Sequence, residues 1–471
     1  MFKNKKEGDV TVEETIAQNK MGSEPVPKVM LAMGIPMIIS MIVQAFYNIV
    51  DSYFVSNMPD AAGITNLGDY AINALTLSFP VQMLIIAVGV GTGVGVNALL
   101  SRAIGERNHK KASRIAGNAI FVGICTYAVF LIFGVFGVKW FLQTQTTDGI
   151  IIGLGCSYLK ICSIFSFGAA GSMIYEKLLQ STGKAVFSTI AQFAGAVTNI
   201  VLDPVLIYGY LGFHAMGVEG AAIATVIGQV LTLVLGMVFH YGWNKEIDGN
   251  IKYLKPNKAT IVGIYKVGAP AILMQALMSV MSYGINVIFG LVSVAAVTAF
   301  GIYYKIQQFV FFAAFGMNNA MIPMIAFNYG KRDRTRVISS IRHGMADTLV
   351  LMLLGTIGLQ LFARQICGAF SLSQQTQQLC VLAIRIVTLG YLFAGANIAF
   401  QGIFQALGCG VKSLMISLVR LIIVVLPLAW WFTMASNAQM LIWWSFPIAE
   451  AAGLVVALIL FRFVNKQKLR F

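Results

Sequence analysis

The sequence is short of charge. Only 11% of its 471 residues are Asp, Glu, Lys or Arg, against about 25% in an average soluble protein. Because 58% of the residues are hydrophobic, a water-soluble protein of this composition could not cover its own surface. The scarcity of charge therefore excludes a soluble enzyme. The apolar stretches that recur along the whole chain instead predict an all-α polytopic membrane protein.

Residues typical of metal centres and catalytic sites are also scarce. The six cysteines lie in or beside apolar segments, with no CxxC spacing and no histidine at ligand spacing, so we expect no metal site of that kind. Only Cys367 and Cys380, which flank one loop, could form a pair. HExxH and Ser–His–Asp patterns are absent, and we expect neither enzyme activity nor a cofactor. Because the stretch from Met1 to Lys28 is polar and charged, we expect no cleavable signal peptide.

Twelve apolar segments follow one another, each long enough to cross a bilayer. They are residues 29–57, 70–99, 115–138, 149–173, 185–211, 217–242, 260–290, 295–325, 342–363, 376–402, 413–433 and 439–463. Most of the 33 Lys and Arg lie in the tails and in loops after even-numbered segments, whereas the opposite loops hold only Lys139 and Arg364. This asymmetry predicts that both termini are cytoplasmic, in the plasma membrane of a prokaryote. It also explains the net charge of +15 without a nucleic-acid partner.

The chain repeats itself after six segments. The loop that begins Gly105-Glu-Arg corresponds to the loop that begins Gly330-Lys-Arg, and the same difference in residue number carries Gln82 onto Gln307. A parallel repeat is typical of transporters in which two lobes rock about a central site. We therefore expect two pseudo-symmetric six-helix lobes. The expected order is an N-terminal tail (1–28), the N-terminal lobe (29–243), a cytoplasmic linker (244–258), the C-terminal lobe (259–464) and a C-terminal tail (465–471).

Two acids inside predicted spans are the strongest functional signal. An uncompensated charge there costs roughly 2.5–3.5 kcal/mol even on the gentler insertion scale. Asp51 ends a polar stripe formed with Ser40, Gln44 and Asn48, and Asp203 ends a second stripe formed with Gln192, Gly195 and Asn199. If the stripes face each other, carboxylates and carboxamides converge on a site suited to a sodium ion or a proton. The alternative is that both acids are buried hydrogen-bond anchors without a coupling role.

Other polar and soft side chains are candidates for a substrate cavity. Methionine and aromatic residues can form an adaptable wall for apolar cations. The candidates are Met37, Met41, Gln44, Tyr47, Asn48, Gln192, Met274, Met278 and Met281. Lys305 and Arg420 have no repeat partner, and either could line a cavity in the second lobe.

These segments resemble the multidrug and toxic compound extrusion (MATE) family. The resemblance rests on Pro36 and Asp51 in the first span, on the string from Asn199 to Gly209, and on the string from Gly217 to Thr225. It implies an efflux antiporter that exports small organic cations in exchange for sodium ions or protons and acts as a monomer among membrane lipids. Similarity to the branch with its cation site in the N-terminal lobe implies coupling residues Asp51, Asn199, Asp203 and Thr225, with sodium possible at the first three. A flippase for a lipid-linked saccharide, from the same wider superfamily, is the alternative, and would be expected to use basic cavity residues such as Lys305 or Arg420.

Overall fold

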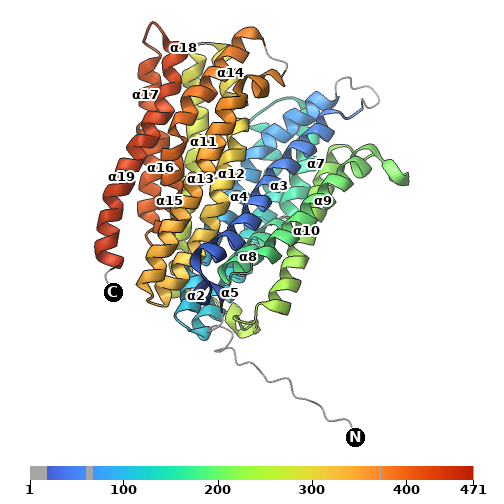
Figure 1. The fold of residues 1–471 in the computed structure, drawn as a ribbon. Coiled ribbons are helices and arrows are strands. Elements are labelled where there is room, and N and C mark those ends of the chain that lie inside the picture. The colour runs from blue at the N-terminus through green and yellow to red at the C-terminus, as the bar shows by residue number, and fades with distance from the viewer. Residues whose placement is uncertain (1–18, 60–66, 371–372, 470–471) are drawn as a thin grey trace.

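The computed structural model describes residues 19–59, 67–370 and 373–469, and all regular structure in these ranges is helical (Figure 1). Within these described ranges, eleven helices are long and apolar enough to cross a membrane. The pair α7 and α8, bent by 43° at a short break, supplies a twelfth span. The chain is thus a polytopic helical membrane protein of two six-helix lobes, as its apolar periodicity predicts.

The first lobe runs from α3 to α10. Its spans are α3 (Val26–Ser56), α4 (Leu67–Gly105), α5 (His109–Ile132) continued by η1 (Phe133–Gly137) and α6 (Val138–Gln143), α7 (Gly149–Ile164) with α8 (Phe167–Ser181), α9 (Ala185–Tyr208) and α10 (Val218–Trp243). A short linker segment, η3 (Ile251–Leu254), leads to the second lobe.

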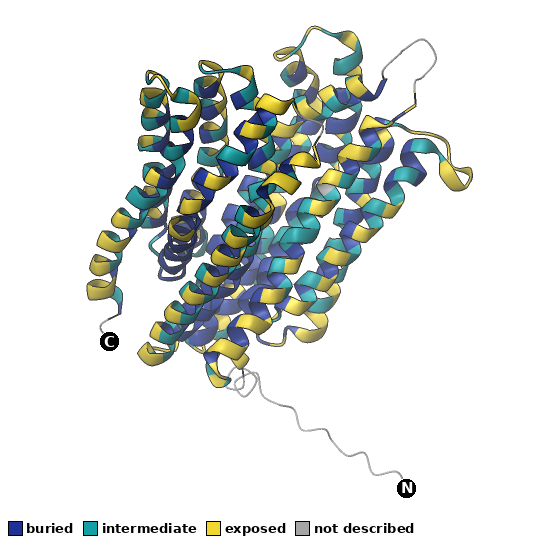
Figure 2. Ribbon diagram, turned by 45° about the horizontal axis from the view of Figure 1, so that its top comes forward, coloured by how far each residue is buried: buried dark blue, intermediate teal, exposed yellow. Residues whose placement is uncertain are grey.

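The second lobe runs from α11 to α19. Its spans are α11 (Lys258–Gly290), α12 (Val294–Gly330), α13 (Arg334–Gly368), α14 (Gln374–Val387) with η4 (Thr388–Gly390) and α15 (Tyr391–Ala406), α16 (Gly410–Leu418) with η5 (Val419–Ile423) and α17 (Val425–Phe432), and α18 (Ala438–Leu441) with η6 (Ile442–Trp444) and α19 (Ser445–Lys468). In both lobes buried residues line the helix–helix contacts, and exposed residues follow the outer helix faces (Figure 2).

The backbone repeats with the sequence. Arg107 and Arg332, which are equivalent positions of the two halves, both adopt left-handed conformations with φ of 55° and 59°. Gly183 and Gly408, which are equivalent in the same way, have φ of 83° and 73°. Equivalent loops of the two lobes therefore turn the chain in the same way, which is the structural counterpart of the sequence repeat.

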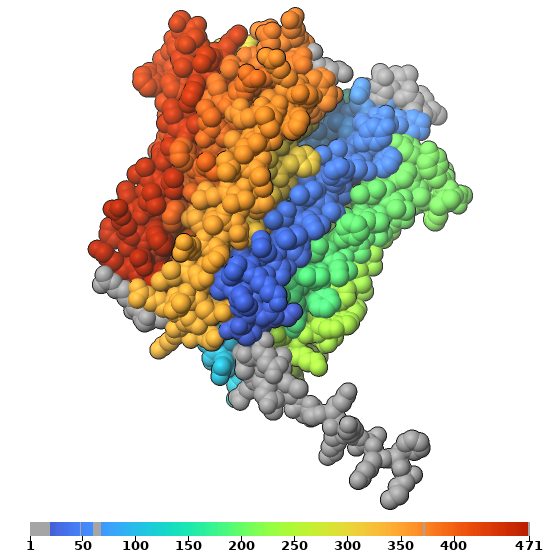
Figure 3. Space-filling model, in the orientation of Figure 1, coloured from blue at the N-terminus to red at the C-terminus, as the bar shows by residue number. Residues whose placement is uncertain are grey.

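The hydrophobic core that joins the lobes lies toward one end of the molecule. This is the lower end in Figure 1, where α2 and the C-terminal end of α19 also lie, and we call it the terminal end. It combines Met30 and Met37 of α3, Ile104 of α4, Ile264 of α11 and Met324 of α12. Toward the opposite end each lobe has hydrophobic clusters of its own, and the helices of the two lobes diverge (Figures 1 and 3).

Glycines bring the lobes into backbone contact at the terminal end. A Cβ on Gly105 of α4 would collide with the carbonyl oxygen of Phe327 in α12, and a Cβ on Gly330 of α12 would collide with that of Arg102 in α4. The two contacts are related by the sequence repeat. Only glycine permits so close an approach, as at other membrane helix crossings.

The segment before the first span also joins the lobes. The fully buried Met21 lies in α2 (Lys20–Ser23), and its carbonyl oxygen accepts hydrogen bonds from Asn328 (3.1 Å) and Arg336 (2.9 Å) of the second lobe. Asn19 donates to the carbonyl oxygen of Thr182 in the first lobe at 3.0 Å. The polar composition of the sequence predicted a tail that extends to Lys28. In the structure, residues 19–24 instead pack against both lobes, and α3 begins at Val26.

Candidate functional site

The helices α3 and α9 pack together inside the first lobe, and the acids that end their polar stripes lie close to each other. Ser40 of α3 donates a hydrogen bond to Thr189 of α9 at 3.0 Å. Asp51 and Asp203 lie further along the same helices, with only 9% and 0% of their surface exposed, and their carboxyl groups interact electrostatically. Each acid lies five residues before the end of its helix, on the side opposite the terminal end. The two acids therefore lie together, whereas Gly195 of the same α9 stripe packs against Gly228 and Thr232 of α10.

Asn199 organises this pair of acids. Its side-chain amide donates to Asp203 Oδ1 at 3.3 Å and to Thr225 Oγ1 of α10 at 3.4 Å. Three buried oxygens of the group have no hydrogen-bond partner among the described residues: Asp51 Oδ1, Asn199 Oδ1 and Asp203 Oδ2. The structure thus brings together the four residues implied by the family resemblance and leaves part of their oxygen surface unsatisfied.

Such a cluster has the chemistry of a hard-cation or proton site. A buried polar oxygen without a partner costs about 1–3 kcal/mol, and a charged one costs more. A bound sodium ion or a proton on a carboxylate would remove that cost. Pro204 has no N–H and cannot donate a helical hydrogen bond to the carbonyl oxygen of Ile200. That carbonyl is therefore a further oxygen without its helical hydrogen bond on α9. Among the described residues no group of three or more His, Cys, Asp and Glu could hold a metal ion.

Two residues of α7 that the sequence did not single out interact with Asp51, and one of them is hydrogen-bonded to Gln82 of α4. Tyr158 and Cys162 of α7 interact electrostatically with its carboxyl group, and Gln82 of α4 donates to the Tyr158 hydroxyl at 3.0 Å. Tyr47, a predicted cavity residue, is close enough to interact with both Asp51 and Asp203. Helices α4 and α7 both carry several polar residues, and their spacing does not by itself indicate contact with Asp51.

The predicted cavity residues have different surroundings. Met37 and Met274 are buried in the core that joins the lobes, and Met281 is buried in the core of the second lobe. They are packing residues in this conformation. Met41, Gln44, Tyr47 and Met278 are half-buried. The side chain of Asn48 lies outside the described part of the structure.

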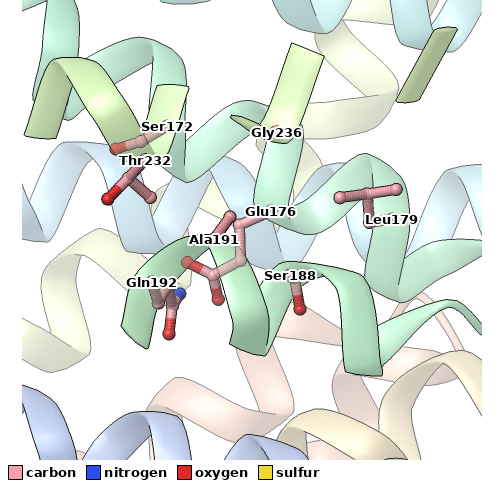
Figure 4. Close-up of a pocket in the computed structure, with 8 residues that line it drawn as sticks. All are labelled: Ser172, Glu176, Leu179, Ser188, Ala191, Gln192, Thr232 and Gly236. Atoms are coloured by element: carbon pink, nitrogen blue, oxygen red, sulfur yellow. The ribbon is translucent and has the colours of Figure 1, made fainter. Parts of the chain in front are cut away.

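Gln192 belongs to a narrow polar crevice within the first lobe (Figure 4). The crevice lies between α8, α9 and α10, nearer the terminal end than the acid pair. Glu176 and Thr232 also line it, and the carboxylate of Glu176 accepts hydrogen bonds from Lys177 and Gln180 at 3.1 and 2.7 Å. Gln192 shares its stripe on α9 with Asn199 and Asp203, so the crevice lies on the same polar face as the cation-site candidates.

The second lobe contains a buried ion pair in place of an acid cluster. Arg420, in the π-helical turn η5, donates to Glu450 Oε1 of α19 at 2.6 Å, and Asn397 donates to Glu450 Oε2 at 2.9 Å. Arg420 is therefore neutralised, while Lys305 is exposed. Sequence reasoning also missed Asp347 of α13, whose half-buried side chain has one oxygen without a partner among the described residues.

Comparison with known proteins agrees with this architecture. A family model described as MatE matches residues 36–205 and 270–431. The multidrug export protein MepA of Staphylococcus aureus (strain bovine RF122 / ET3-1) is 24% identical over 437 residues, which cover 93% of each chain.

Two solved structures show the same fold. One is an outward-facing multidrug resistance MATE family transporter of the MOP superfamily, 23% identical, with a TM-score of 0.88 and coverage of 96% of this chain and 99% of that one. The other is a MOP superfamily transporter from Pyrococcus furiosus, 22% identical, with a TM-score of 0.86 and coverage of 96% and 98%; its title reports a binding pocket of reverse polarity that suggests a different function. Because the family model matches well over half of the sequence, this chain belongs to the MatE family.

Proposed function

We propose that this protein is a secondary active multidrug efflux antiporter, which exports organic cations in exchange for sodium ions or protons. The observation that carries the proposal is the set of three unpartnered oxygens on Asp51, Asn199 and Asp203 in the buried interior of the first lobe. Two neighbouring carboxylates in such a place favour occupation by a cation over an empty site. The names of MepA and of the MATE transporter structure support export of drugs.

The distribution of basic residues favours a cytoplasmic location for the terminal end. With that orientation the lobes are closed on the cytoplasmic side and apart on the outer side. The acid pair, near the outer ends of α3 and α9, then lies where a cation entering from outside can reach it. Binding there stabilises α3 against α9, whereas an emptied site leaves two carboxylates in mutual repulsion. The coupling ion thereby biases the equilibrium between outward- and inward-facing states by its differential affinity.

The alternative function, a flippase for a lipid-linked saccharide, receives less support. An anionic lipid head group would need basic residues in the cavity between the lobes. Arg420 is held by Glu450 and is only 8% exposed, which leaves Lys305 as the remaining candidate of the two. The reverse polarity reported for the Pyrococcus furiosus relative has no counterpart in the acid pair of this chain.

Transport into or out of proteoliposomes tests the proposal. Efflux of a fluorescent organic cation is driven separately by an inward sodium gradient and an inward proton gradient, for the wild type, Asp203→Asn and Asp347→Asn. Asp347 is the matched control because it is an intramembrane acid outside the site. We expect one gradient to drive efflux by the wild type and Asp347→Asn but not by Asp203→Asn. Equal gradient-driven efflux by all three proteins, or no efflux of several cations with either gradient, would overturn the proposal.

A further inference from the structure

A second pocket lies at the terminal end, away from the acid pair. It has a volume of about 430 Å³ and lies between the start of α5, the linker segment η3 and the start of α11. Four of its seven lining residues carry a positive charge, and the other three are Tyr253, Pro256 and Asn257. The four cations are Lys110, Arg114, Lys252 and Lys255, and all four are exposed.

The positive charge of this pocket is largely uncompensated. Lys252 has the exposed carboxylate of Asp248 at 3.6 Å. Within the described ranges, no ion pair involves Lys110, Arg114 or Lys255. The neighbouring Lys111 and Arg102, by contrast, both pair with Glu106, at 2.6 and 2.9 Å. The excess of Lys and Arg in the loops on one side of the membrane accounts for basic residues at this end of the molecule. It does not account for four cations around one pocket.

The wall of the pocket is held in place by the fold. The side-chain amide of the fully buried Asn118 donates to the carbonyl oxygens of Tyr253 and Lys255 at 3.2 and 3.3 Å. Its carbonyl oxygen accepts a hydrogen bond from the backbone N–H of Asn257 at 2.7 Å. Gly117 lets the linker approach α5 directly, since a Cβ there would collide with the backbone of Tyr253. The linker cations are therefore fixed against those of α5.

The pocket continues into surfaces that face lipid. Lys110 and Arg114 share one face of α5 with side chains that are exposed or half-buried and run toward the bilayer centre: Phe121, Cys125, Ala128 and Ile132. On α11 an exposed stripe starts beside the pocket and runs through Val262, Lys266 and Leu273. Val262 and Leu273 are 58% and 53% exposed. A molecule with an anionic head and apolar tails would place its head in the pocket and its tails along these two stripes.

We propose that this pocket binds the phosphate head group of an anionic phospholipid from the leaflet at the terminal end. Phosphate oxygens accept charge-assisted hydrogen bonds from Arg and Lys, and basic pockets beside membrane helices recognise anionic lipids in this way. The lipid would connect the first lobe, through α5, to the linker and to the start of the second lobe. The proposal is independent of the drug and of the coupling ion.

Lipid binding to purified protein tests this assignment. Native mass spectrometry would compare phosphatidylglycerol, phosphatidylcholine and soluble glycerol 3-phosphate as ligands. The pocket variant is K110Q/R114Q/K252Q/K255Q, with the milder R114Q/K255Q as a second variant. The matched control, R334Q/R342Q/R462Q/K466Q, removes four exposed cations at the terminal end of the second lobe. Unchanged melting temperatures in phosphatidylcholine establish that each variant is folded.

We expect the wild type and the control to retain phosphatidylglycerol in preference to phosphatidylcholine. Each cation removed from the pocket should weaken that binding about fivefold, so that R114Q/K255Q loses about 25-fold. Glycerol 3-phosphate should not displace the lipid, because it lacks tails for the two stripes. Equal phosphatidylglycerol binding by the pocket variant and the wild type, or equal binding of both lipids by the wild type, would overturn the proposal. Tight binding of glycerol 3-phosphate alone would identify a soluble phosphate compound as the ligand and would also overturn it.

Discussion

Replacing Gly330 by alanine should open the terminal end of the transporter. Gly330 of α12 packs against the backbone of α4, where a Cβ would overlap the carbonyl oxygen of Arg102 and lie 3.0 Å from its carbonyl carbon and 3.1 Å from the nitrogen of Glu106. Ordinary Cβ contacts begin at about 3.4 Å. All three atoms belong to the backbone, so no side chain can rotate away and the two helices must move apart.

The size of the effect follows from the cost of overpacking. Inserting a methyl group into a closed backbone contact costs about 1–3 kcal/mol. The intrinsic preference of helices for alanine over glycine acts in both conformations and cancels. The conformation closed at the terminal end should therefore lose about five- to 150-fold in population relative to the one open there. The control is Gly301→Ala in the same helix, because a Cβ on Gly301 meets nothing within 4 Å.

Distances between the lobes at the opposite end report this equilibrium. Spin labels on cysteines introduced at Leu211 and Val294, which are 86% and 82% exposed, would be measured by double electron–electron resonance in a background without the six native cysteines. We expect Gly330→Ala to shift the distribution toward shorter distances, as the opposite end closes, and Gly301→Ala to match the parent protein. Identical distributions for both variants would refute the idea that glycine contacts hold the terminal end closed.

Three further predictions concern other contacts. Thr225→Val should weaken binding of the coupling ion roughly tenfold by removing one polar oxygen beside Asn199, as measured by the gradient needed for half-maximal efflux; unchanged coupling would exclude Thr225 from the site. Arg420→Met should destabilise the fold by about 3–5 kcal/mol by leaving the carboxylate of Glu450 buried and unpaired, and the double variant Arg420→Met/Glu450→Leu should recover most of that loss in thermal unfolding. If the double variant is no more stable than Arg420→Met, the pairing does not account for the loss. Burial acts to raise the pKa of Glu106, but hydrogen bonds from Lys111 and Arg102 lower it below the usual 4.5. The ionised Glu106 carboxylate therefore stabilises the fold fully above pH 4.5, and this stabilisation disappears as the pH falls through the lowered pKa. Glu106→Gln should therefore be less stable than the wild type at neutral pH, and the difference in melting temperature should vanish in acid; a difference independent of pH would contradict this.

The sequence predicted the fold and the approach of the two buried acids for a physical reason. In a membrane span the bilayer cannot satisfy polar side chains, so each polar stripe must face protein or water. Asp51 and Asp203 ended stripes on two otherwise apolar helices, and the structure places the two acids close together. The lobes were equally predictable, because the internal repeat is carried by glycines and charges in equivalent loops.

Contacts between distant segments could not be predicted in the same way. The ion pair between Arg420 and Glu450 joins two helices whose relative rotation is set by packing. The sequence showed only an arginine inside a predicted span, without an equivalent in the first half. Residues 19–24 look like a polar tail, yet their backbone carbonyls accept hydrogen bonds from the second lobe, the Asn19 side chain donates one to the first lobe, and Met21 is fully buried. Tyr158 of α7 interacts electrostatically with Asp51 of α3, and no local pattern indicated that these two helices meet there.

Direct measurement of cation binding tests the central claim, that the oxygens of Asp51, Asn199 and Asp203 form the coupling site. Binding of radioactive sodium and the accompanying release of protons would be measured on the purified protein in lipid nanodiscs across a pH series, for the wild type, Asp51→Asn, Asp203→Asn and Asp347→Asn. The account predicts that the wild type and Asp347→Asn bind sodium with proton release, or titrate a proton that sodium does not displace, and that both site variants lose this behaviour. If Asp51→Asn and Asp203→Asn bind the cation and release protons as the wild type does, the central claim is contradicted.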